Sequence, residues 1–97
     1  MARARNIKPG LFKNELLVEQ SLFVRLLFVG LWTLADREGR LEDRPKRIRL
    51  ELFPYDNDDV DSALNILVEN GFIVRYQAAG FNVIVTFASC YISKFIA

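Results

Sequence analysis

The sequence contains no histidine and a single cysteine, Cys90. These absences exclude metal sites built from histidine and cysteine ligands, histidine-dependent catalytic triads and an internal disulfide. A lone thiol is typical of a reducing compartment, so we expect a cytoplasmic protein. A long hydrophobic run is also missing, because the longest one, residues 22–35, is interrupted by Arg25 and Thr33. It is too short to cross a bilayer, and the basic N-terminus is not followed by the apolar core of a secretory signal.

Patterns that bind metals or carry catalysis are missing as well. The acidic run at residues 56–61 lacks the glycine and the final glutamate of a calcium-binding loop, and helix capping accounts for its carboxylates. No nucleophile stands beside a base, and there is no glycine-rich phosphate loop. We therefore expect a protein that is not an enzyme and that needs no cofactor and no metal ion.

With 97 residues, the chain forms one small domain at most. Hydrophobic residues make up 52% and charged residues 26%, which excludes a disordered chain. The net charge is only +1, but the charges are segregated. Residues 1–13 and 44–49 are basic without any acid, whereas residues 51–61 contain five acids and no lysine or arginine. This arrangement predicts separate basic and acidic surfaces, of which the first can meet phosphates and the second a basic partner.

Hydrophobic periodicity and capping residues predict the helices. The segment at residues 22–36 is apolar nearly all round, which predicts a helix in the middle of the fold. Gly30 lies within it, where we expect another element to approach closely. The helices and their expected caps are residues 15–19 after Asn14, residues 22–36 after Ser21, residues 44–53 after Asp43, and residues 58–70 with Asn57 or Asp58 as cap.

Strands are expected at residues 40–42, 72–77 and 81–87, the last two joined by the short turn Ala78-Ala79-Gly80. A helix-turn-helix followed by a β-hairpin is the order of a winged helix. We therefore predict an α+β, mainly helical winged-helix domain over residues 14–87. It follows a basic N-terminal arm at residues 1–13 and precedes an apolar C-terminal tail at residues 88–97, which either packs on the domain or covers a partner's surface.

A standard winged-helix contact with DNA is doubtful here. The helix at residues 58–70 is the expected recognition helix, but its outward side carries acids and no lysine or arginine. Phosphates repel carboxylates, so only Ser62 and Asn65 are suited to contact DNA from this helix. The hairpin turn is uncharged, and Arg75 is the only cation near it.

Basic residues in two other segments are the better candidates for phosphate contacts. Cations on a helix and on an N-terminal arm are a common, though unspecific, feature of DNA-binding domains. An alternative is a solvated helix face paired with neighbouring acids. The DNA-binding candidates are Arg3, Arg5, Lys8, Lys13, Arg44, Lys46, Arg47, Arg49 and Asn65.

Residues 4–10, 25–48 and 54–76, read as ARNIKPG, RLLFVGLWTLADREGRLEDRPKRI and PYDNDDVDSALNILVENGFIVRY, carry a resemblance over most of the chain. The chain resembles the N-terminal winged-helix region of phage and prophage replication-initiation, or replisome-organiser, proteins. The resemblance implies binding to origin or single-stranded DNA and contacts with a helicase or its loader. The apolar tail departs from that family, which puts a loader-contacting role in doubt.

Two hypotheses follow for the function. The first is a small phage-derived winged-helix protein that binds single- or double-stranded DNA in replication initiation. The second is a protein-binding winged helix that recruits or inhibits host nucleic-acid machinery, a phage or host replication protein among others, through an acidic face. A homodimer is a further possibility. The residues of the acidic face are Asp56, Asp58, Asp59, Asp61 and Glu69.

Overall fold

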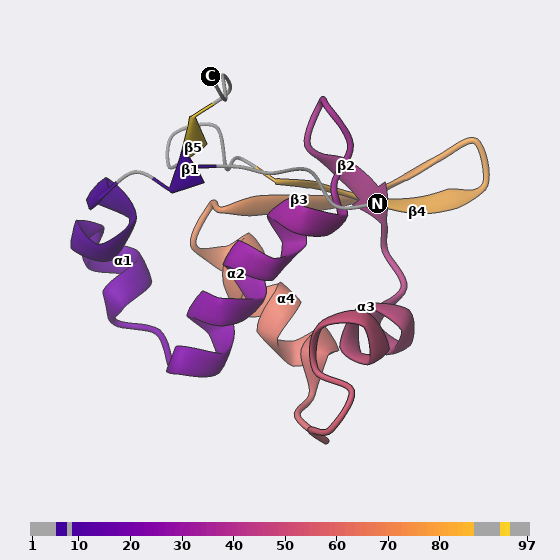
Figure 1. Cartoon of the computed structure of the whole chain (residues 1–97). Coiled ribbons are helices and arrows are strands. Elements are labelled where there is room, and N and C mark those ends of the chain that lie inside the picture. The colour runs from indigo at the N-terminus through magenta and orange to yellow at the C-terminus, as the bar shows by residue number, and fades with distance from the viewer. Residues whose placement is uncertain (1–5, 8, 87–91, 94–97) are drawn as a thin grey trace.

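The computed structural model describes residues 6–7, 9–86 and 92–93 (Figure 1). The helical elements are η1 (Pro9–Lys13), α1 (Glu15–Val18), α2 (Leu22–Leu34), α3 (Pro45–Leu52) and α4 (Val60–Glu69). The strands are β1 (Asn6–Ile7), β2 (Arg40–Glu42), β3 (Ile73–Ala78), β4 (Phe81–Thr86) and β5 (Ile92–Ser93). Every helix and strand predicted between residues 14 and 87 is present, and its ends differ from the prediction by at most two residues.

The main sheet has three antiparallel strands in the order β2-β4-β3. Its register pairs Leu41 with Ile84 and Tyr76 with Val83. The helices gather on one side of this sheet (Figure 1), and α3 and α4 precede the β3–β4 hairpin in the chain. This order of elements is the α+β topology of a winged helix, which confirms the predicted fold class.

The hairpin closes through a tight turn at Ala79-Gly80. Both residues have positive φ, 53° at Ala79 and 82° at Gly80. Two positive φ values in a two-residue loop match the right-handed twist of the flanking strands, and the second is free of steric cost at a glycine. Ala78, expected in the turn, pairs with Phe81 as the last residue of β3.

The hydrophobic core lies between the helices and the inner face of the sheet. The largest fully buried side chains are Leu17, Leu27, Phe28, Leu31, Leu64, Leu67, Ile73 and Ile84. Gly30 allows α3 to approach α2, because a Cβ at that position would lie 2.7 Å from Leu52 Cδ1. The close approach predicted at Gly30 is therefore confirmed.

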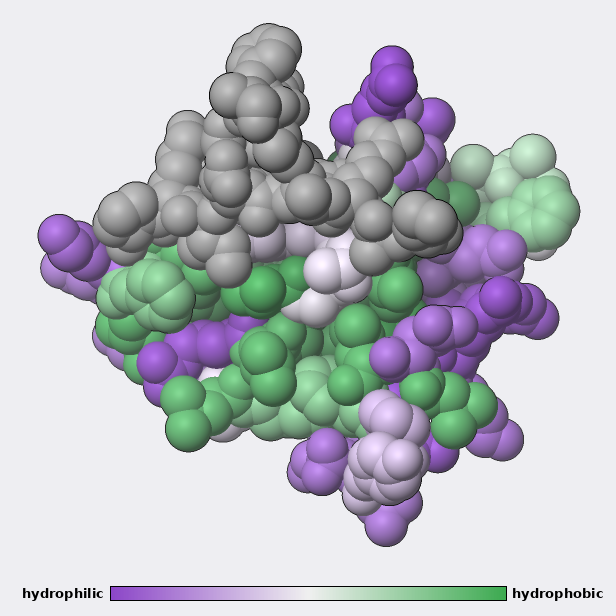
Figure 2. Space-filling model, viewed as in Figure 1, coloured by the Kyte–Doolittle hydropathy of each residue, from purple (hydrophilic) through white to green (hydrophobic). Residues whose placement is uncertain are grey.

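The sequence predicts α2 in the middle of the fold, but only part of its apolar surface is buried. Leu22 and Leu26 are exposed, and the neighbouring η1 and α1 leave Phe12 and Leu16 exposed too. Hydrophobic surface is visible on this side of the molecule in Figure 2. In a chain of this size the sheet and three helices cover only part of α2, so its apolar circumference exceeds the surface available to bury it.

The first two predicted helix caps are confirmed and the other two are wrong. Asn14 Oδ1 accepts from the Leu17 N–H at 3.0 Å, and Ser21 Oγ accepts from the Val24 N–H at 3.3 Å. The N-cap of α3 is Arg44, which makes no side-chain capping bond, whereas the side chain of Asp43 binds Arg75. Asp59, rather than Asn57 or Asp58, caps α4 by accepting from the Ser62 N–H.

The segments predicted as arm and tail contribute to the structure. Residues 9–13 form η1, whose Leu11 belongs to the core with only 3% of its surface exposed. β1 pairs antiparallel with β5, with Asn6 opposite Ser93. The described part of the chain therefore includes core contacts before residue 14 and a strand pair that joins residues 6–7 to residues 92–93. Within it, none of the helices has the length and apolar character needed to cross a membrane.

Candidate nucleic-acid interface

The basic segment at residues 44–49 lies at the start of α3. Pro45 occupies the first turn, where its missing N–H costs no helical hydrogen bond. Ile48 is buried in the core, so the helix turns the opposite side outward. Arg44 at the N-cap and Lys46 and Arg47 within the helix are exposed. We call these three residues the α3 cation cluster.

The side chains of two members of the α3 cation cluster are free of ion pairs and hydrogen bonds with the described residues. Arg44 Nε lies 3.6 Å from Glu42 Oε2, in a pair that is well exposed on both sides. The side chains of Lys46 and Arg47 make no ion pair and no hydrogen bond with any other residue that the structure describes. Their charges are therefore available to an anion in solution, and the exposed Arg44–Glu42 pair adds little stability that binding would have to replace.

Arg49, predicted together with these cations, has a different role. Its side chain is half-buried, and Nη1 donates to the backbone carbonyl oxygen of Asp56 at 2.7 Å. This bond connects α3 to the loop before α4. Arg49 therefore stabilises the helix-turn-helix and is a weaker candidate for a phosphate contact than the α3 cation cluster.

An open pocket of about 300 Å³ lies beside the cluster, between the end of α2, β2 and α3. Leu34, Leu41 and Ile48 contribute its apolar lining. The charged lining residues are Glu42, Arg44, Arg47 and Glu51. These two carboxylates balance the two guanidinium groups, so the pocket has no net charge that would attract an anion.

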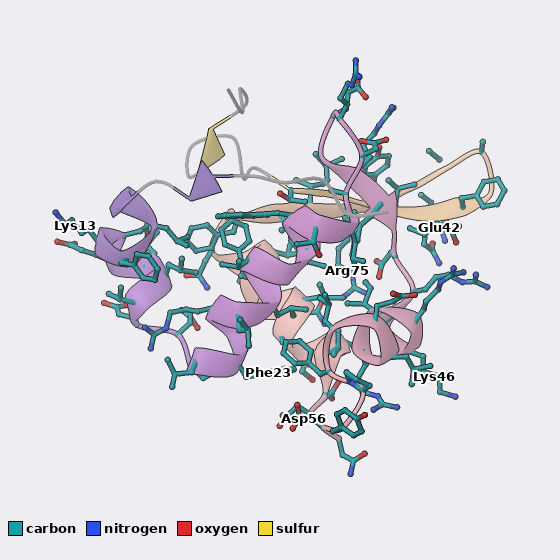
Figure 3. All side chains as sticks on the ribbon, in the orientation of Figure 1. Lys13, Phe23, Glu42, Lys46, Asp56 and Arg75 are labelled. Atoms are coloured by element: carbon teal, nitrogen blue, oxygen red, sulfur yellow. The ribbon has the colours of Figure 1, made fainter. Side chains whose placement is uncertain are left out.

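Lys13, the candidate from the predicted arm that the structure describes, does not join the cluster. Figure 3 shows Lys13 and Lys46 at opposite ends of the molecule. Lys13 is exposed at the end of η1. Arg3, Arg5 and Lys8 lie outside the described residues. The structure therefore separates Lys13 on η1 from the α3 cation cluster.

Asn65 is exposed on α4, and its amide oxygen is already engaged. Asn65 Oδ1 accepts from Arg75 Nη1 at 2.8 Å, and Asp61 Oδ1 accepts from Arg75 Nη2 at 2.8 Å. The hydrogen bonding of the Arg75 guanidinium to the Asp43 carboxylate is the main cause that raises the pKa of Arg75 above its ordinary value. Arg75 thus binds carboxylates of the protein itself, although it was the only cation near the hairpin turn.

Strand alternation is the sequence signal that indicates this role of Arg75. Arg75 is two residues from Ile73, which is buried, so both side chains point to the helix side of the sheet. A guanidinium on that face requires a carboxylate partner, because an unpaired charge is costly away from water.

The acidic residues of the predicted face fall into two groups. Asp59 accepts from the Ser62 hydroxyl at 2.7 Å and from its N–H at 3.1 Å, and the hydroxyl bond is the main cause that lowers the pKa of Asp59. Asp61 is paired with Arg75. The side chains of Asp56, Asp58 and Glu69 are exposed and bind no described residue. Part of the acidic face therefore serves α4, and part is free.

Comparison with known proteins gives no match, since no family model, no curated protein and no solved structure is significantly similar to this chain. Among residues 6–7, 9–86 and 92–93, the structure groups no three His, Cys, Asp or Glu side chains in a way that could hold a metal ion.

Proposed function

We propose that this chain is a winged-helix protein that binds nucleic acid by holding phosphates with the α3 cation cluster. The observation that carries the proposal is the exposure of Lys46 and Arg47 without a partner among the described residues. Lysine and arginine side chains on a rigid helix supply the counterion-release term that dominates non-specific affinity for DNA. Such binding has little sequence preference, because phosphate contacts position a protein without reading bases.

The carboxylates at the start of α4 favour a contact through α3 rather than through α4, the usual recognition helix. Asp59 and Asp61 stand in the first turn of α4 or at its cap, and both are engaged in bonds that stabilise the helix and its contact with β3. An approaching phosphate would meet carboxylates at this end of α4. The α3 cation cluster offers the opposite sign, so the electrostatic preference favours α3.

We further propose that the protein acts in phage DNA replication initiation in a cytoplasmic setting. The support is the resemblance of residues 4–10, 25–48 and 54–76 to phage replication-initiation proteins. In this proposal Arg3, Arg5 and Lys8 add phosphate contacts from the N-terminal segment.

Salt-dependent fluorescence anisotropy with a labelled oligonucleotide tests the phosphate contacts. The double variant Lys46→Ala/Arg47→Ala is expected to weaken binding and to reduce the slope of log K against log salt by about 1.4 to 1.8, which corresponds to two lost contacts. The matched control is Arg37→Ala/Arg40→Ala, which removes the same charge from the turn before β2 and from β2 itself. An equal slope for both double variants would refute the assignment to α3.

A second candidate function, protein binding through the acidic face, is favoured by one observation. Tyr55 in the α3–α4 loop is 97% exposed and stands beside Asp56, with Asp58 close by in the chain. An exposed tyrosine flanked by carboxylates suits a contact with a basic protein surface, since tyrosine is enriched at protein interfaces. Loss of partner capture in Tyr55→Ala, with unchanged binding of nucleic acid, would support this candidate.

A further inference from the structure

The tip of the β3–β4 hairpin carries an exposed aromatic ring. Phe81 is the first residue of β4 and 64% of its surface is accessible. The preceding turn, Ala79-Gly80, has positive φ at both residues and contains no large or charged side chain. The short turn holds Phe81 opposite Ala78 in the strand register. The ring is therefore presented from a paired strand, with only small neighbours at the tip.

The register places further residues on the same face of the sheet as Phe81. Val83, two residues along β4, pairs with Tyr76 on β3 and with Glu42 on β2. Side chains two residues apart on a strand share a face, so Phe81, Tyr76 and Glu42 all lie on the outer side of the sheet. Tyr76 and Phe81 are diagonal cross-strand neighbours, a relation in which the residues are about 7–8 Å apart.

One cation of the α3 cation cluster, Arg44, lies near the strand next to β4 in the sheet. Arg44 Nε lies 3.6 Å from Glu42 Oε2, so the guanidinium lies beside β2, an edge strand of the sheet. The Asp43 N–H donates to the Asn82 carbonyl oxygen at 2.9 Å, so the start of α3 is fastened to the residue next to Phe81. In Figure 1 the hairpin tip and α3 lie on the same flank of the molecule. The hydrogen bond between Asp43 and Asn82 thus brings the backbone next to Arg44 beside the backbone next to Phe81.

We propose that Phe81 stacks on an unpaired nucleobase while Arg44 binds a neighbouring phosphate. This inference rests on the proposed nucleic-acid binding, and it adds a contact with bases to a surface that otherwise holds only phosphates. In an intact duplex the faces of the bases are covered by their neighbours, so the ring finds a free face only where bases are unpaired. Stacking of this kind tolerates any base, because every base has a π-face.

The test compares wild-type protein with Phe81→Ala, Phe81→Leu and Phe81→Trp. The probes are a labelled single strand, the same strand carrying abasic sites, and an intact duplex of equal length. Phe81→Ala and Phe81→Leu are expected to weaken binding to the single strand about 5- to 100-fold, the range for loss of one stacked base. Binding to the abasic strand and to the duplex, which offer the same phosphates, should stay within about 2-fold of the wild type.

Phe81→Leu is the matched control for size and apolar character, and Phe81→Trp should retain single-strand binding because it keeps a ring. Since Phe81 is exposed, the thermal midpoint of all three variants should stay close to that of the wild type. Equal losses on the normal and the abasic strand, or no loss on either, would overturn the stacking role while leaving the α3 proposal in place.

The failure of the broader proposal has a different signature. If the wild-type protein binds none of the probes at low salt, nucleic-acid binding itself is refuted, and the stacking role with it. If Phe81→Ala changes the sedimentation coefficient of the protein but not its binding to the single strand, the hairpin tip is a contact between protein copies, which also overturns the inference.

Discussion

Arg75 of β3 binds Asp43 through two hydrogen bonds, from Nε to Oδ2 at 2.6 Å and from Nη2 to Oδ1 at 2.9 Å. The side chains are only 20% and 8% exposed, respectively. Because Asp43 lies between β2 and α3, and Arg75 also binds Asp61 of α4, one guanidinium joins the sheet to both helices of the helix-turn-helix. The two-point geometry matches the planar fork of arginine to a carboxylate and fixes the direction of the contact.

Breaking this pair should destabilise the protein. Asp43→Ala is expected to lower the free energy of unfolding by about 2 kcal/mol, because bonds between charged groups in a partly buried site are lost. Arg75→Lys should also be destabilising, since a lysine cannot reproduce the two-point contact. Urea denaturation of both single variants and of the double variant measures the coupling between the two residues.

The control for this prediction is Arg40→Ala, which breaks an exposed ion pair with Asp36 and another with Glu38. Its expected cost is below about 1 kcal/mol, because exposed pairs contribute little. A loss in Asp43→Ala no larger than that of Arg40→Ala would contradict the structural role assigned to Arg75.

Gly39 is required at the turn before β2 for two reasons. Its φ is +79°, and a Cβ would lie 2.8 Å from the carbonyl oxygen of Thr86, a backbone atom of β4. Gly71 has a similar φ of +77°, but a Cβ there meets nothing within 4 Å. Gly71→Ala should therefore cost about 1–2 kcal/mol from backbone strain alone, and Gly39→Ala should cost more. Equal thermal midpoints for the two variants would show that the contact with Thr86 adjusts freely.

The elements of the fold follow well from local signals in the sequence. Pro45, Pro54 and Asn70-Gly71 mark where helices begin or end, and alternation with β-branched residues marks the hairpin strands. The cap at Asp43 was wrong because capping is a local signal, whereas Asp43 is engaged by Arg75, which is 32 residues away in the chain. A tertiary ion pair of this separation cannot be read from a window of neighbouring residues.

The candidate site can be predicted from the sequence less completely than the fold. Residue type alone suffices to indicate the cations at residues 44–49, but only the structure separates the exposed Lys46 and Arg47 from Arg49, which binds the Asp56 carbonyl oxygen. Sequence distance likewise does not reveal that Lys13 lies far from α3. The sequence does not indicate a role for Phe81, because a phenylalanine at the start of a strand is ordinarily part of a core.

Because a carboxylate, that of Asp59, caps α4, we expect the protein to lose stability in acid. The Ser62 hydroxyl, together with the Ser62 N–H, lowers the pKa of Asp59 below its ordinary value of 3.8. A lowered folded-state pKa means that the contribution is present above the unfolded pKa and is lost as the pH falls through the folded pKa. Asp59→Asn keeps an acceptor without the charge, so its thermal midpoint should fall less than that of the wild type between about pH 6 and pH 3.

Asp58→Asn is the matched control for this titration, because Asp58 is an exposed neighbour whose side chain binds no described residue. Its acid profile should follow that of the wild type. If Asp58→Asn and Asp59→Asn change the profile equally, the effect belongs to the charge of the loop and not to the cap.

The free carboxylates of the α3–α4 loop should weaken the binding of nucleic acid by α3. The Asp56 carbonyl oxygen is bonded to Arg49, so the loop lies close to the helix that carries the α3 cation cluster. We therefore expect Asp56 and Asp58 to repel phosphates held by Lys46 and Arg47 at low salt, where charges are screened least. Asp56→Asn/Asp58→Asn is expected to tighten binding about 2- to 5-fold at low salt and to have no effect at high salt. Anisotropy at both salt concentrations measures this change, and weaker binding in the double variant would argue that these carboxylates serve the interface. The same variant separates the two candidate functions, because capture of a basic protein by the acidic face should decrease where the affinity for nucleic acid increases.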